Sequence, residues 1–327
     1  MRTLSGQTAP EAIHGGSTGL LPPLPRSPRE GATATPTTDA LLARFARDAL
    51  IEEARLTPKP ALVDARGSGA HRDLDLATML RSAHTLEPTF AALARAAYGA
   101  QPGVALRTEL ARIGRVGEAA MLRATQGSNT HRGAIWIVGL LVAAAAIHDA
   151  AAPAENAGAH TVAARICETA AQIAHFDDLR ATPTESNGER VRARYNVGGA
   201  RREAQDGFPH VLNVGLPALH AARVQGHEES VARIDALLAI IASLDDTCVL
   251  HRAGIAGRDA AQHGARRVRA AGGIATGAGR AAFDALERAL LALNASPGGA
   301  ADLLAATLFI DRLLHHRTRA RMASWNN

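Results

Sequence analysis

Four polar stretches of this sequence concentrate residue types that could bind or react, and the first contains the chain's single lysine. It reads TPKPALVDARGSGAHRDLD and holds Lys59, Asp64, His71, Asp73 and Asp75. Carboxylates near the start of a helix could simply cap it and favour its dipole. Capping does not account for Lys59, Asp64 and His71 together, and the Gly-Ser-Gly segment lets the backbone approach a ligand closely. Taken alone, the stretch leaves both a ligand-binding loop and ordinary helix capping open.

The second stretch, GSNTHRGAIW at 127–136, precedes an apolar segment. Asn129 or Thr130 suits the N-cap of a helix that begins there. A helix N-terminus beside Arg132 is also a ready site for an anion, because its backbone N–H groups and its dipole favour negative charge. A cap followed by one solvated histidine, His131, explains the same residues equally well, so both interpretations stay open.

The third stretch, GGARREAQDGFP at 198–209, combines two cations with a carboxylate. Arg201 and Arg202 could hold phosphates through paired N–H groups. Glu203 could bind a metal ion or orient the arginines. A solvated cluster of charges is the ordinary meaning of such a run, and it remains the alternative.

The fourth stretch, SLDDTCVLHR at 243–252, places two adjacent carboxylates after an apolar segment. Asp245 and Asp246 would lie at the C-terminus of that helix, where the dipole favours cations. A Mg²⁺ ion is the natural compensation, because it binds carboxylate oxygens. In the alternative interpretation Asp246 begins a new helix and Asp245 is exposed.

Helices are the elements that must position these stretches. Alanine and leucine recur at helical spacing, alanine favours the helix, and no sustained alternation typical of strands is present. A first helix begins near Thr38 and ends at the prolines of TPKP. Further helices are expected at about 74–97, 104–124, 131–150, 159–175, 209–223, 228–244, 258–270, 280–293 and 300–317. The predicted fold class is all-α.

The domain organisation follows from composition along the chain. Residues 1–37 are rich in Gly, Pro, Ser and Thr and are expected to form a disordered N-terminal extension. Residues 38–327 are expected to form a single multi-helix globular domain, in which 181–207 is a long loop around one short helix. The apolar run Ala134–Ile147 is too short to span a bilayer and predicts a buried core helix.

The overall composition limits the partners of the protein. Its residues are 47% hydrophobic but only 3% aromatic, and its net charge is +5 with 31 acidic residues. The excess of arginine is consistent with a solvated surface or with a phosphate site. Few aromatic side chains could stack on bases, so no nucleic-acid partner is expected. No apolar run is long enough to span a bilayer, so no membrane partner is expected either. Cys167 and Cys248 show no pairing motif, which favours a reduced, cytoplasmic protein.

Taken together and in this order, six blocks resemble one enzyme family. They are TPKPALVD, SGAHRDLD, GSNTHRGAI, GARREAQDGFP, LDDTCVLHR and SPGGAADLLAATLF. The chain from about residue 40 to 317 closely resembles the triphosphoribosyl-dephospho-CoA synthases of citrate lyase and malonate decarboxylase systems. The last block is more similar to the malonate decarboxylase branch.

The resemblance implies a specific reaction. Enzymes of this family join ATP to 3′-dephospho-CoA and release adenine, with the new bond running from C1′ of the ATP ribose to a ribose 2′-hydroxyl. The product is the precursor of the prosthetic group on an acyl carrier protein. The resemblance therefore implies ATP and 3′-dephospho-CoA as substrates, Mg²⁺ as cofactor, and transient contact with the carrier protein or its holo-transferase.

The same resemblance implies three groups of site residues. Substrate contacts are expected from Lys59, Ser68, Asn129, Thr130, Arg132 and Arg201. Catalytic groups, as base, charge stabiliser or leaving-group contact, are expected among Asp64, Glu203, His71 and His131. Ligands for Mg²⁺ are expected among Asp73, Asp75, Asp245 and Asp246. Cys248 stands where the family tends to have asparagine, which removes a polar ligand beside Asp246.

Two other functions stay open at this point. An ADP-ribosyl hydrolase-like enzyme would also be all-α, use paired aspartates with Mg²⁺ and cleave at a ribose C1′, but it would transfer the ribose to water. The TPKP and SGAHRDLD blocks argue against it. A helical binding module without activity is the third alternative. The sequence makes no prediction about the oligomeric state.

Overall fold

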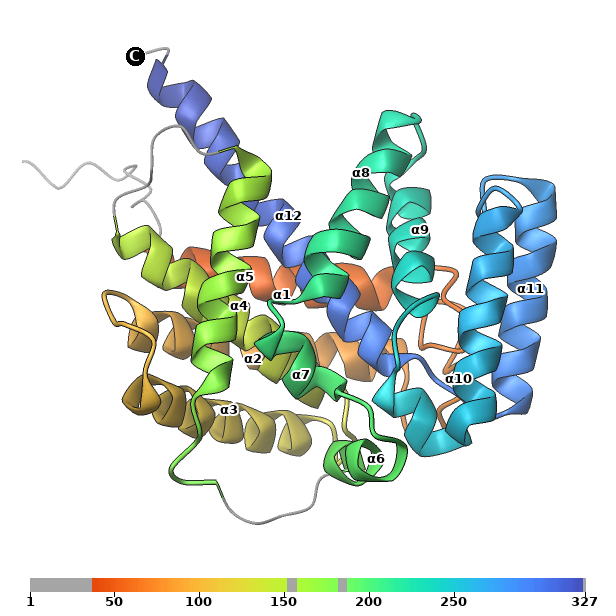
Figure 1. Ribbon diagram of the computed structural model, residues 1–327, viewed down its shortest axis with the longest axis horizontal. Coiled ribbons are helices and arrows are strands. Elements are labelled where there is room, and N and C mark those ends of the chain that lie inside the picture. The colour runs from red at the N-terminus through yellow and green to blue at the C-terminus, as the bar shows by residue number, and fades with distance from the viewer. Residues whose placement is uncertain (1–36, 152–157, 182–186, 326–327) are drawn as a thin grey trace, which may run out of the picture. The chain divides into compact units, whose positions relative to one another are not determined.

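The computed structural model describes residues 37–151, 158–181 and 187–325 of the chain. Within these ranges the chain forms twelve α-helices, one π-helical turn and no strand (Figure 1). The predicted all-α class is therefore confirmed. The described residues belong to one unit of contacts, Pro36–Asn327. The predicted disordered extension, 1–37, lies outside the described residues except for Thr37.

Short connections join most of the helices. Their bounds are α1 Thr38–Arg55, α2 Leu76–Ala97, α3 Val104–Ala124, α4 Arg132–Ala150, α5 Ala159–His175, α6 Asn187–Tyr195, α7 Gly199–Gln205, η1 His210–Gly215, α8 Leu216–Val224, α9 Glu229–Ile241, α10 Thr247–Ala270, α11 Gly277–Ala292 and α12 Gly298–Trp325. Consecutive helices pack in pairs, α1 with α2, α8 with α9 and α10 with α11 (Figure 1). Helix α12 contacts α1, α4 and α9, so it connects early and late parts of the chain.

Helix α4 forms the centre of the hydrophobic core. All but one of the residues from Ala134 to Ala146 are buried, and α4 packs against α1, α2, α3, α5, α7 and α12. A helix that is apolar on all sides is expected inside a protein. Among the described residues, α4 is the one helix long and apolar enough to cross a membrane by length and composition, and 67% of that window is buried within the protein. The predicted buried core helix is confirmed.

The helix boundaries differ from the prediction in two regions. The expected loop over 181–207 contains two helices, α6 and α7, and the expected helix over 209–223 begins as the π-helical turn η1. Helix α10 begins at Thr247 rather than near residue 258, and Gly254 interrupts it with φ 63° and ψ −158°. Glycine adopts this conformation without the steric penalty of a side chain. Because of this break, the residues before Gly254 do not continue the helical spacing of those after it, and the sequence did not predict the early turns of α10.

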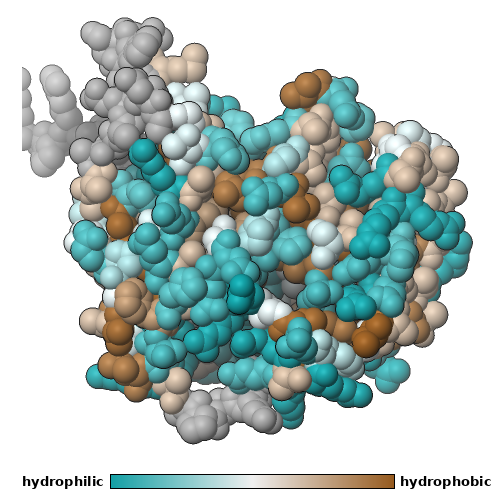
Figure 2. All heavy atoms as spheres, viewed as in Figure 1, coloured by the Kyte–Doolittle hydropathy of each residue, from teal (hydrophilic) through white to brown (hydrophobic). Residues whose placement is uncertain are grey.

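Polar side chains dominate the face of the molecule drawn in Figure 2. Hydrophilic residues cover most of this face, and the hydrophobic ones lie in small, separate groups. Arginines on the described surface commonly pair with carboxylates, as Arg112 does with Glu109 and Arg95 with Asp39. These pairs are consistent with a solvated surface over much of the protein.

Candidate active site

A cavity of about 1110 Å³ lies where α4, α10 and α12 begin. The loop between α1 and α2 and the short helices α6 and α7 complete its lining. Helix N-termini present backbone N–H groups and a partial positive charge, so this position suits negatively charged groups. Most of the predicted site residues line the cavity, namely Lys59, His71, Asp73, Asn129, Thr130, His131, Arg132, Arg201, Glu203, Asp245 and Asp246.

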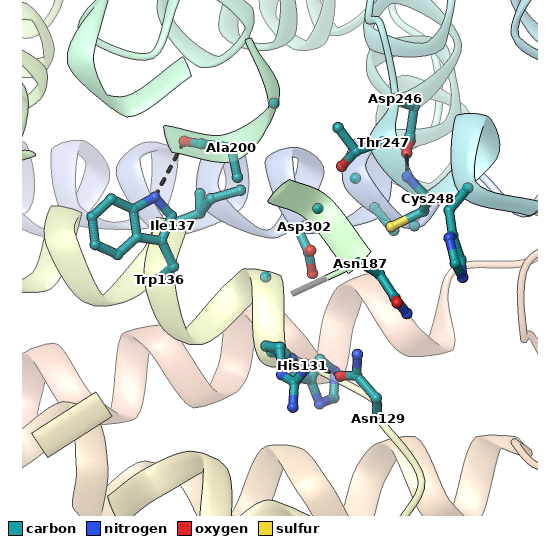
Figure 3. A pocket seen from close by; sticks show the side chains of 18 of the residues that line it. Asn129, His131, Trp136, Ile137, Asn187, Ala200, Asp246, Thr247, Cys248 and Asp302 are labelled. Carbon is teal, nitrogen blue, oxygen red and sulfur yellow. Dashed lines mark hydrogen bonds between the residues drawn. The ribbon is translucent and has the colours of Figure 1, made fainter. Parts of the chain in front are cut away.

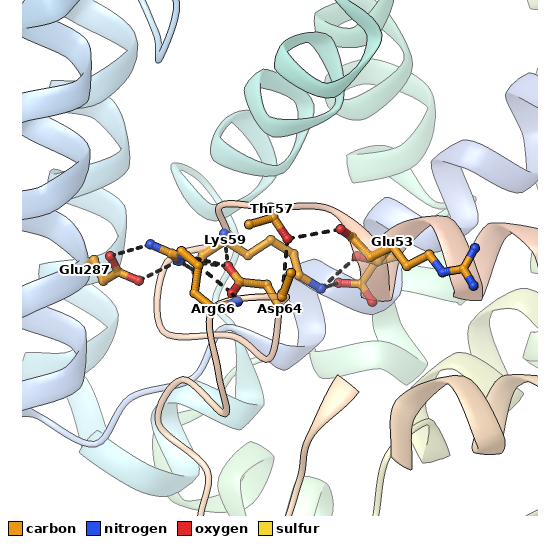
Figure 4. A network of polar contacts seen from close by, with 8 residues as sticks. Glu53, Thr57, Lys59, Asp64, Arg66 and Glu287 are labelled. Atoms are coloured by element: carbon orange, nitrogen blue, oxygen red, sulfur yellow. Dashed lines mark hydrogen bonds and ion pairs between the residues drawn. The ribbon is translucent and has the colours of Figure 1, made fainter. Parts of the chain in front are cut away.

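Three predicted site residues lie outside the described lining. Asp75 is exposed and caps α2, accepting a hydrogen bond from the Thr78 backbone N–H at 2.7 Å, so the capping interpretation was right. Asp64 binds the Arg66 guanidinium at 2.8 Å and accepts from the Lys59 backbone N–H at 2.8 Å, which stabilises the loop itself (Figure 4). Neither side chain lies among the residues that line the cavity, and the roles of Asp75 as a metal ligand and of Asp64 as a catalytic group stay predictions.

The glycine segment around Ser68 also serves the loop rather than a ligand. The Ser68 carbonyl accepts a hydrogen bond from the His71 backbone N–H at 3.0 Å. Gly69 has φ 55°, and a side chain there would collide with the Ala61 carbonyl. The close backbone approach that the sequence indicated is therefore made to the protein's own chain, and Ser68 as a substrate contact stays a prediction.

Lys59 has a buried partner that the sequence analysis missed. Its Nζ donates to the Glu53 carboxylate at 2.6 Å and to the Glu53 carbonyl at 2.7 Å (Figure 4). Both side chains are almost completely buried, and both line the cavity. A signal was present, because Glu53 follows Ala49 and Leu50 on the apolar stripe of α1, where a charged residue is out of place.

Asp246 joins the beginnings of two helices. Its Oδ1 accepts from the Cys248 backbone N–H at 2.8 Å in α10, and its Oδ2 accepts from the Ala300 backbone N–H at 2.9 Å in α12. Burial raises the pKa of this carboxyl group, and the surrounding N–H groups oppose that rise. Asp245 is exposed and lies 3.5 Å from Arg258. Asp246 therefore begins a new helix, as the alternative interpretation held.

Asp302 is a second carboxylate of the cavity, half-buried, and the sequence analysis missed it. Gly133 at the beginning of α4 leaves room for its Oδ2, and the Ala134 backbone N–H donates to it. Burial, together with the negative charges of Glu53 and Asp246, raises its pKa well above the ordinary value. Asp302 forms no ion pair with a described residue. Asp302 lies in the SPGGAADLLAATLF block, near the beginning of α12. A carboxylate at that position was the one sequence feature that could have marked it as a site residue.

His131 occupies the N-cap position of α4 and is buried. Its Nδ1 lies 2.7 Å from the Ser82 hydroxyl, and the Thr130 hydroxyl donates to Ser82 at 2.6 Å. Its Nε2 has no partner. Burial, with the charge of Lys59, lowers its pKa to about 3, so the ring is neutral at physiological pH. Of the two interpretations left open for this stretch, the one with a solvated histidine is contradicted, because the side chain is buried.

Arginines form the cationic part of the lining. The Arg107 guanidinium lies 4.7 Å from the centre of the Trp136 ring, and the Trp136 Nε1–H donates to the Ala200 carbonyl at 3.2 Å (Figure 3). The buried Nε atoms of Arg107 and Arg192 have no partner. Burial lowers the pKa of Arg107. The sequence analysis missed both arginines, because nothing local distinguishes them from the many others in the chain.

The predicted cations Arg132 and Arg201 lie at the same cavity with partners of their own. Arg132 pairs with Glu118, and Arg201 lies 3.1 Å from Asp177. The Asn129 side-chain oxygen accepts from the Arg132 backbone N–H at 3.2 Å, so Asn129 helps to cap α4. These residues hold the edge of the cavity in place.

Glu203 and His71 complete the predicted set. The Glu203 carboxylate lies 2.8 Å from His210 Nδ1, and this hydrogen bond and charge outweigh burial and raise the His210 pKa. His71 Nε2 lies 2.8 Å from the Ser296 hydroxyl. Burial, and then the charge of Arg252, lowers the His71 pKa. Both groups are therefore oriented by neighbours within the protein.

No group of three or more His, Cys, Asp or Glu side chains is arranged to hold a metal ion in the part of the chain that the structure describes. Carboxylates do line the cavity, namely Asp73, Asp245 and Asp246 among the predicted ligands. Mg²⁺ commonly binds through one or two carboxylates together with substrate phosphates and water. The donor set therefore fits Mg²⁺ that arrives with a nucleotide.

Comparison with known proteins places these features in a family. The family model described as CitG, ATP:dephospho-CoA triphosphoribosyl transferase, matches residues 39–320. A protein of Pseudomonas paraeruginosa (strain DSM 24068 / PA7), named probable 2-(5''-triphosphoribosyl)-3'-dephosphocoenzyme-A synthase, is 56% identical over 283 residues, which are 86% of this chain and 94% of that protein. The 2-(5''-triphosphoribosyl)-3'-dephosphocoenzyme-A synthase of Klebsiella pneumoniae is 53% identical over 272 residues, 83% of this chain and 94% of that protein.

No solved structure matches the chain at a significant level. The family model nevertheless covers almost all of the described helices, from α1 into α12. By this model and by its relatives, the chain belongs to the ATP:dephospho-CoA triphosphoribosyl transferase family.

Proposed function

We propose that this protein transfers the triphosphoribosyl group of ATP to the ribose 2′-hydroxyl of 3′-dephospho-CoA and releases adenine. Membership of the family supports the reaction. The structural observation that carries it is one cavity in which arginines with unused N–H groups and carboxylates without cationic partners face the same space. The arginines would bind the negatively charged triphosphate. The carboxylates would stabilise the positive charge that develops on the ribose carbon C1′.

The reaction breaks one bond and forms one. The bond from C1′ to N9 breaks, and its electron pair leaves with adenine. The oxygen of the 2′-hydroxyl forms the new bond to C1′ and loses its proton, and adenine gains one proton overall. Positive charge builds at C1′ in the transition state, as in other glycosyl transfers.

Buried arginines are suited to the triphosphate. Arg107 and Arg192 each keep a buried Nε–H without a partner, and a phosphate oxygen would satisfy both. Lys59 has used two of its three N–H groups on Glu53, so one remains for a phosphate oxygen. The proposed role of Lys59 in phosphate binding is thus compatible with its buried ion pair.

The carboxylates at the helix beginnings are suited to C1′ and the 2′-hydroxyl. A negative charge held near C1′ stabilises the developing positive charge. Asp302 is the better base, because it forms no ion pair with a described residue and burial favours its taking a proton. Asp246 is held by backbone N–H groups of two helices and is better suited to electrostatic stabilisation. Glu203 lies 2.8 Å from His210 Nδ1 and is better suited to orienting the His210 ring than to acting as the base.

Mg²⁺ would be held by Asp245, Asp246 and Asp73 together with the triphosphate. The ion would neutralise phosphate charge when bound. The residues of the chain then position the nucleotide: Arg107 and Arg192 hold the phosphates, and the cavity excludes bulk water from C1′. Cys248 contributes its backbone N–H, which donates to Asp246 Oδ1, rather than a metal ligand.

The destination of the product is a further part of the proposal. The SPGGAADLLAATLF ending supports the malonate decarboxylase system, whose carrier protein or holo-transferase would meet the enzyme transiently. The predicted cytoplasmic location is consistent with a reaction that uses ATP and a coenzyme A precursor.

Adenine release tests the proposed function. The purified protein is incubated with ATP and Mg²⁺, with and without 3′-dephospho-CoA, and the nucleotide product is weighed by mass spectrometry. Adenine release that requires dephospho-CoA, with a product mass equal to both substrates minus adenine, is expected. Release without dephospho-CoA, leaving ribose triphosphate, would identify a hydrolase instead.

Two arginine variants test the assignment of the phosphate site. Arg107→Ala and Arg192→Ala should raise the KM for ATP by roughly tenfold or more, because each removes a charge-assisted hydrogen bond. Arg112→Ala is the matched control, since Arg112 is exposed on α3 and pairs with Glu109. Unchanged KM values for ATP in both cavity variants would place the triphosphate elsewhere.

A further inference from the structure

The Nε2 atom of His131 is a buried polar atom that no described residue satisfies. The side chain is almost fully buried and lines the cavity (Figure 3). Its other ring nitrogen, Nδ1, lies 2.7 Å from the Ser82 hydroxyl. Buried polar groups in proteins nearly always have a partner. An unsatisfied ring nitrogen at the wall of a substrate cavity therefore indicates a ligand atom.

Two hydroxyl groups determine which ring nitrogen carries the hydrogen. The Thr130 hydroxyl donates to Ser82 Oγ at 2.6 Å, so the Ser82 hydroxyl is free to donate to His131 Nδ1 at 2.7 Å. A neutral imidazole has one donor nitrogen and one acceptor nitrogen. When Nδ1 accepts from Ser82, the hydrogen is on Nε2, and the unsatisfied atom is an N–H donor.

The charges around His131 indicate what kind of ligand atom could accept a hydrogen bond from its Nε2–H group. Lys59, which is paired with Glu53, is close enough to influence the ring, and Asp302 reaches the beginning of α4 next to His131. The carboxylate of Asp302 would repel a phosphate beside the His131 ring. A ring nitrogen of a purine is a neutral acceptor and meets no such repulsion.

We propose that Ser82 and Thr130 are positioning residues that hold His131 in the Nε2–H form, and that this N–H donates to a ring nitrogen of the departing adenine. The inference rests on the proposed function for the identity of the ligand. Negative charge moves onto the purine as the C1′–N9 bond breaks, and a fixed donor stabilises it. His131 keeps its hydrogen throughout, so the proton balance of the reaction is unchanged.

The ring form can be measured without any substrate. Nitrogen NMR of ¹⁵N-histidine-labelled protein distinguishes a protonated ring nitrogen from an unprotonated one, and the His131→Asn spectrum identifies the His131 signals. We expect a hydrogen on Nε2, none on Nδ1, and no titration between about pH 5 and pH 8. A hydrogen on Nδ1 would overturn the proposed arrangement, whatever the activity of the protein.

Variants connect the ring form to catalysis. Ser82→Ala and Thr130→Val should weaken the preference for Nε2–H, and Ser82→Ala should lower kcat by roughly tenfold to 100-fold while the KM for ATP changes little. Ser243→Ala is the matched control, because Ser243 is not among the residues that line the cavity and its hydroxyl donates to the backbone carbonyls of Ala239 and Ile240 in α9. Melting temperatures identify any variant that fails to fold, in which case Thr130→Val carries the test. A folded Ser82→Ala variant with the kcat of the control would contradict the proposal.

Adenine analogues locate the contact. ATP analogues with carbon in place of N3 or N7 are compared in the natural protein and in Ser82→Ala. One analogue should react more slowly than ATP in the natural protein, and this penalty should shrink in the variant. Equal penalties in both proteins would overturn the adenine contact. A natural protein that is folded but releases no adenine from ATP would overturn the proposed function and this contact together, while the NMR result would still decide the ring form.

Discussion

The Lys59 ammonium lies 2.6 Å from the Glu53 carboxylate, and the two side chains are buried together beside the cavity. The pair connects the last turn of α1 to the loop that follows it (Figure 4). A lysine ammonium also bonds to the Glu53 carbonyl, where a planar guanidinium would need more room. In a chain that otherwise uses arginine for positive charge, this geometry accounts for the single lysine.

Breaking this pair should destabilise the fold. Lys59→Met leaves the Glu53 charge buried without a partner, and we expect the free energy of unfolding to fall by about 3–5 kcal/mol. Replacing both residues, as Lys59→Met with Glu53→Leu, should recover most of that loss, because an apolar pair needs no desolvated charge. Urea denaturation measures both changes. If Lys59→Met keeps the stability of the natural protein and loses only ATP binding, the lysine is a phosphate ligand and little else.

The sequence predicted the long helices and the family, and both predictions are confirmed. Helix α4 and the first helix could be predicted because apolar residues repeat at helical spacing over many turns. Only one short helix was expected in 181–207, where the structure has two, α6 and α7, because they bury few residues and offer too little pattern. The early turns of α10 were hidden by Gly254, whose conformation depends on its surroundings rather than on its neighbours in sequence.

The residues that line the cavity were easier to predict in loops than on helix faces. Lys59, His131 and Asp246 interrupt local patterns, and all three line the cavity. Glu53 was missed although its charge interrupts the apolar stripe of α1. Asp302 was missed because its charged neighbours Glu53 and Asp246 lie far away in the sequence. Asp75 and Asp64 show that a helix cap and a loop contact use the same residue type as a metal ligand or a base, so the sequence alone could not separate these roles.

Removing the carboxylate of Asp246 should affect stability and activity more strongly than removing that of Asp75. Asp246→Ala removes the side-chain acceptor for α10 and for α12, so we expect a loss of about 2 kcal/mol or more and strongly reduced adenine release. Asp75→Ala is the matched control, since it removes one exposed cap on α2 away from the cavity. Its loss of stability should be smaller and its activity unchanged. Comparable loss of activity in the two variants would show that capping, rather than the place of Asp246 in the cavity, determines activity.

The buried His131 predicts a specific dependence of stability on pH. Its pKa is about 3 in the folded protein and about 6.5 in an unfolded chain. The unfolded state therefore binds more protons between these values, and stability rises with pH there. The contribution of His131 is complete above about pH 6.5 and is lost as the pH falls toward 3, by up to roughly 1.4 kcal/mol per pH unit.

Denaturation of the natural protein and of His131→Asn at several pH values measures this contribution. The difference in free energy of unfolding between the two proteins removes the effects of other titrating groups. We expect this difference to be constant above pH 7 and to decrease in favour of the variant as the pH falls to 4. A difference that stays constant down to pH 4 would mean that the ring can accept a proton in the folded state.

Gly133 should be required for the position of Asp302. A methyl group at Gly133 would collide with the Asp302 carboxylate, which would have to turn away from the Ala134 backbone N–H. We expect Gly133→Ala to reduce adenine release by about 100-fold, because small displacements of a reacting group are costly to catalysis. Gly114→Ala is the matched control, since it also lies in a helix and its new methyl group would meet Ile135 at an ordinary 3.7 Å. That variant should keep full activity and gain up to about 1 kcal/mol of stability from helix propensity. Full activity in both variants would mean that Asp302 does not take part in the reaction, and the base would then have to be sought among the other carboxylates of the cavity.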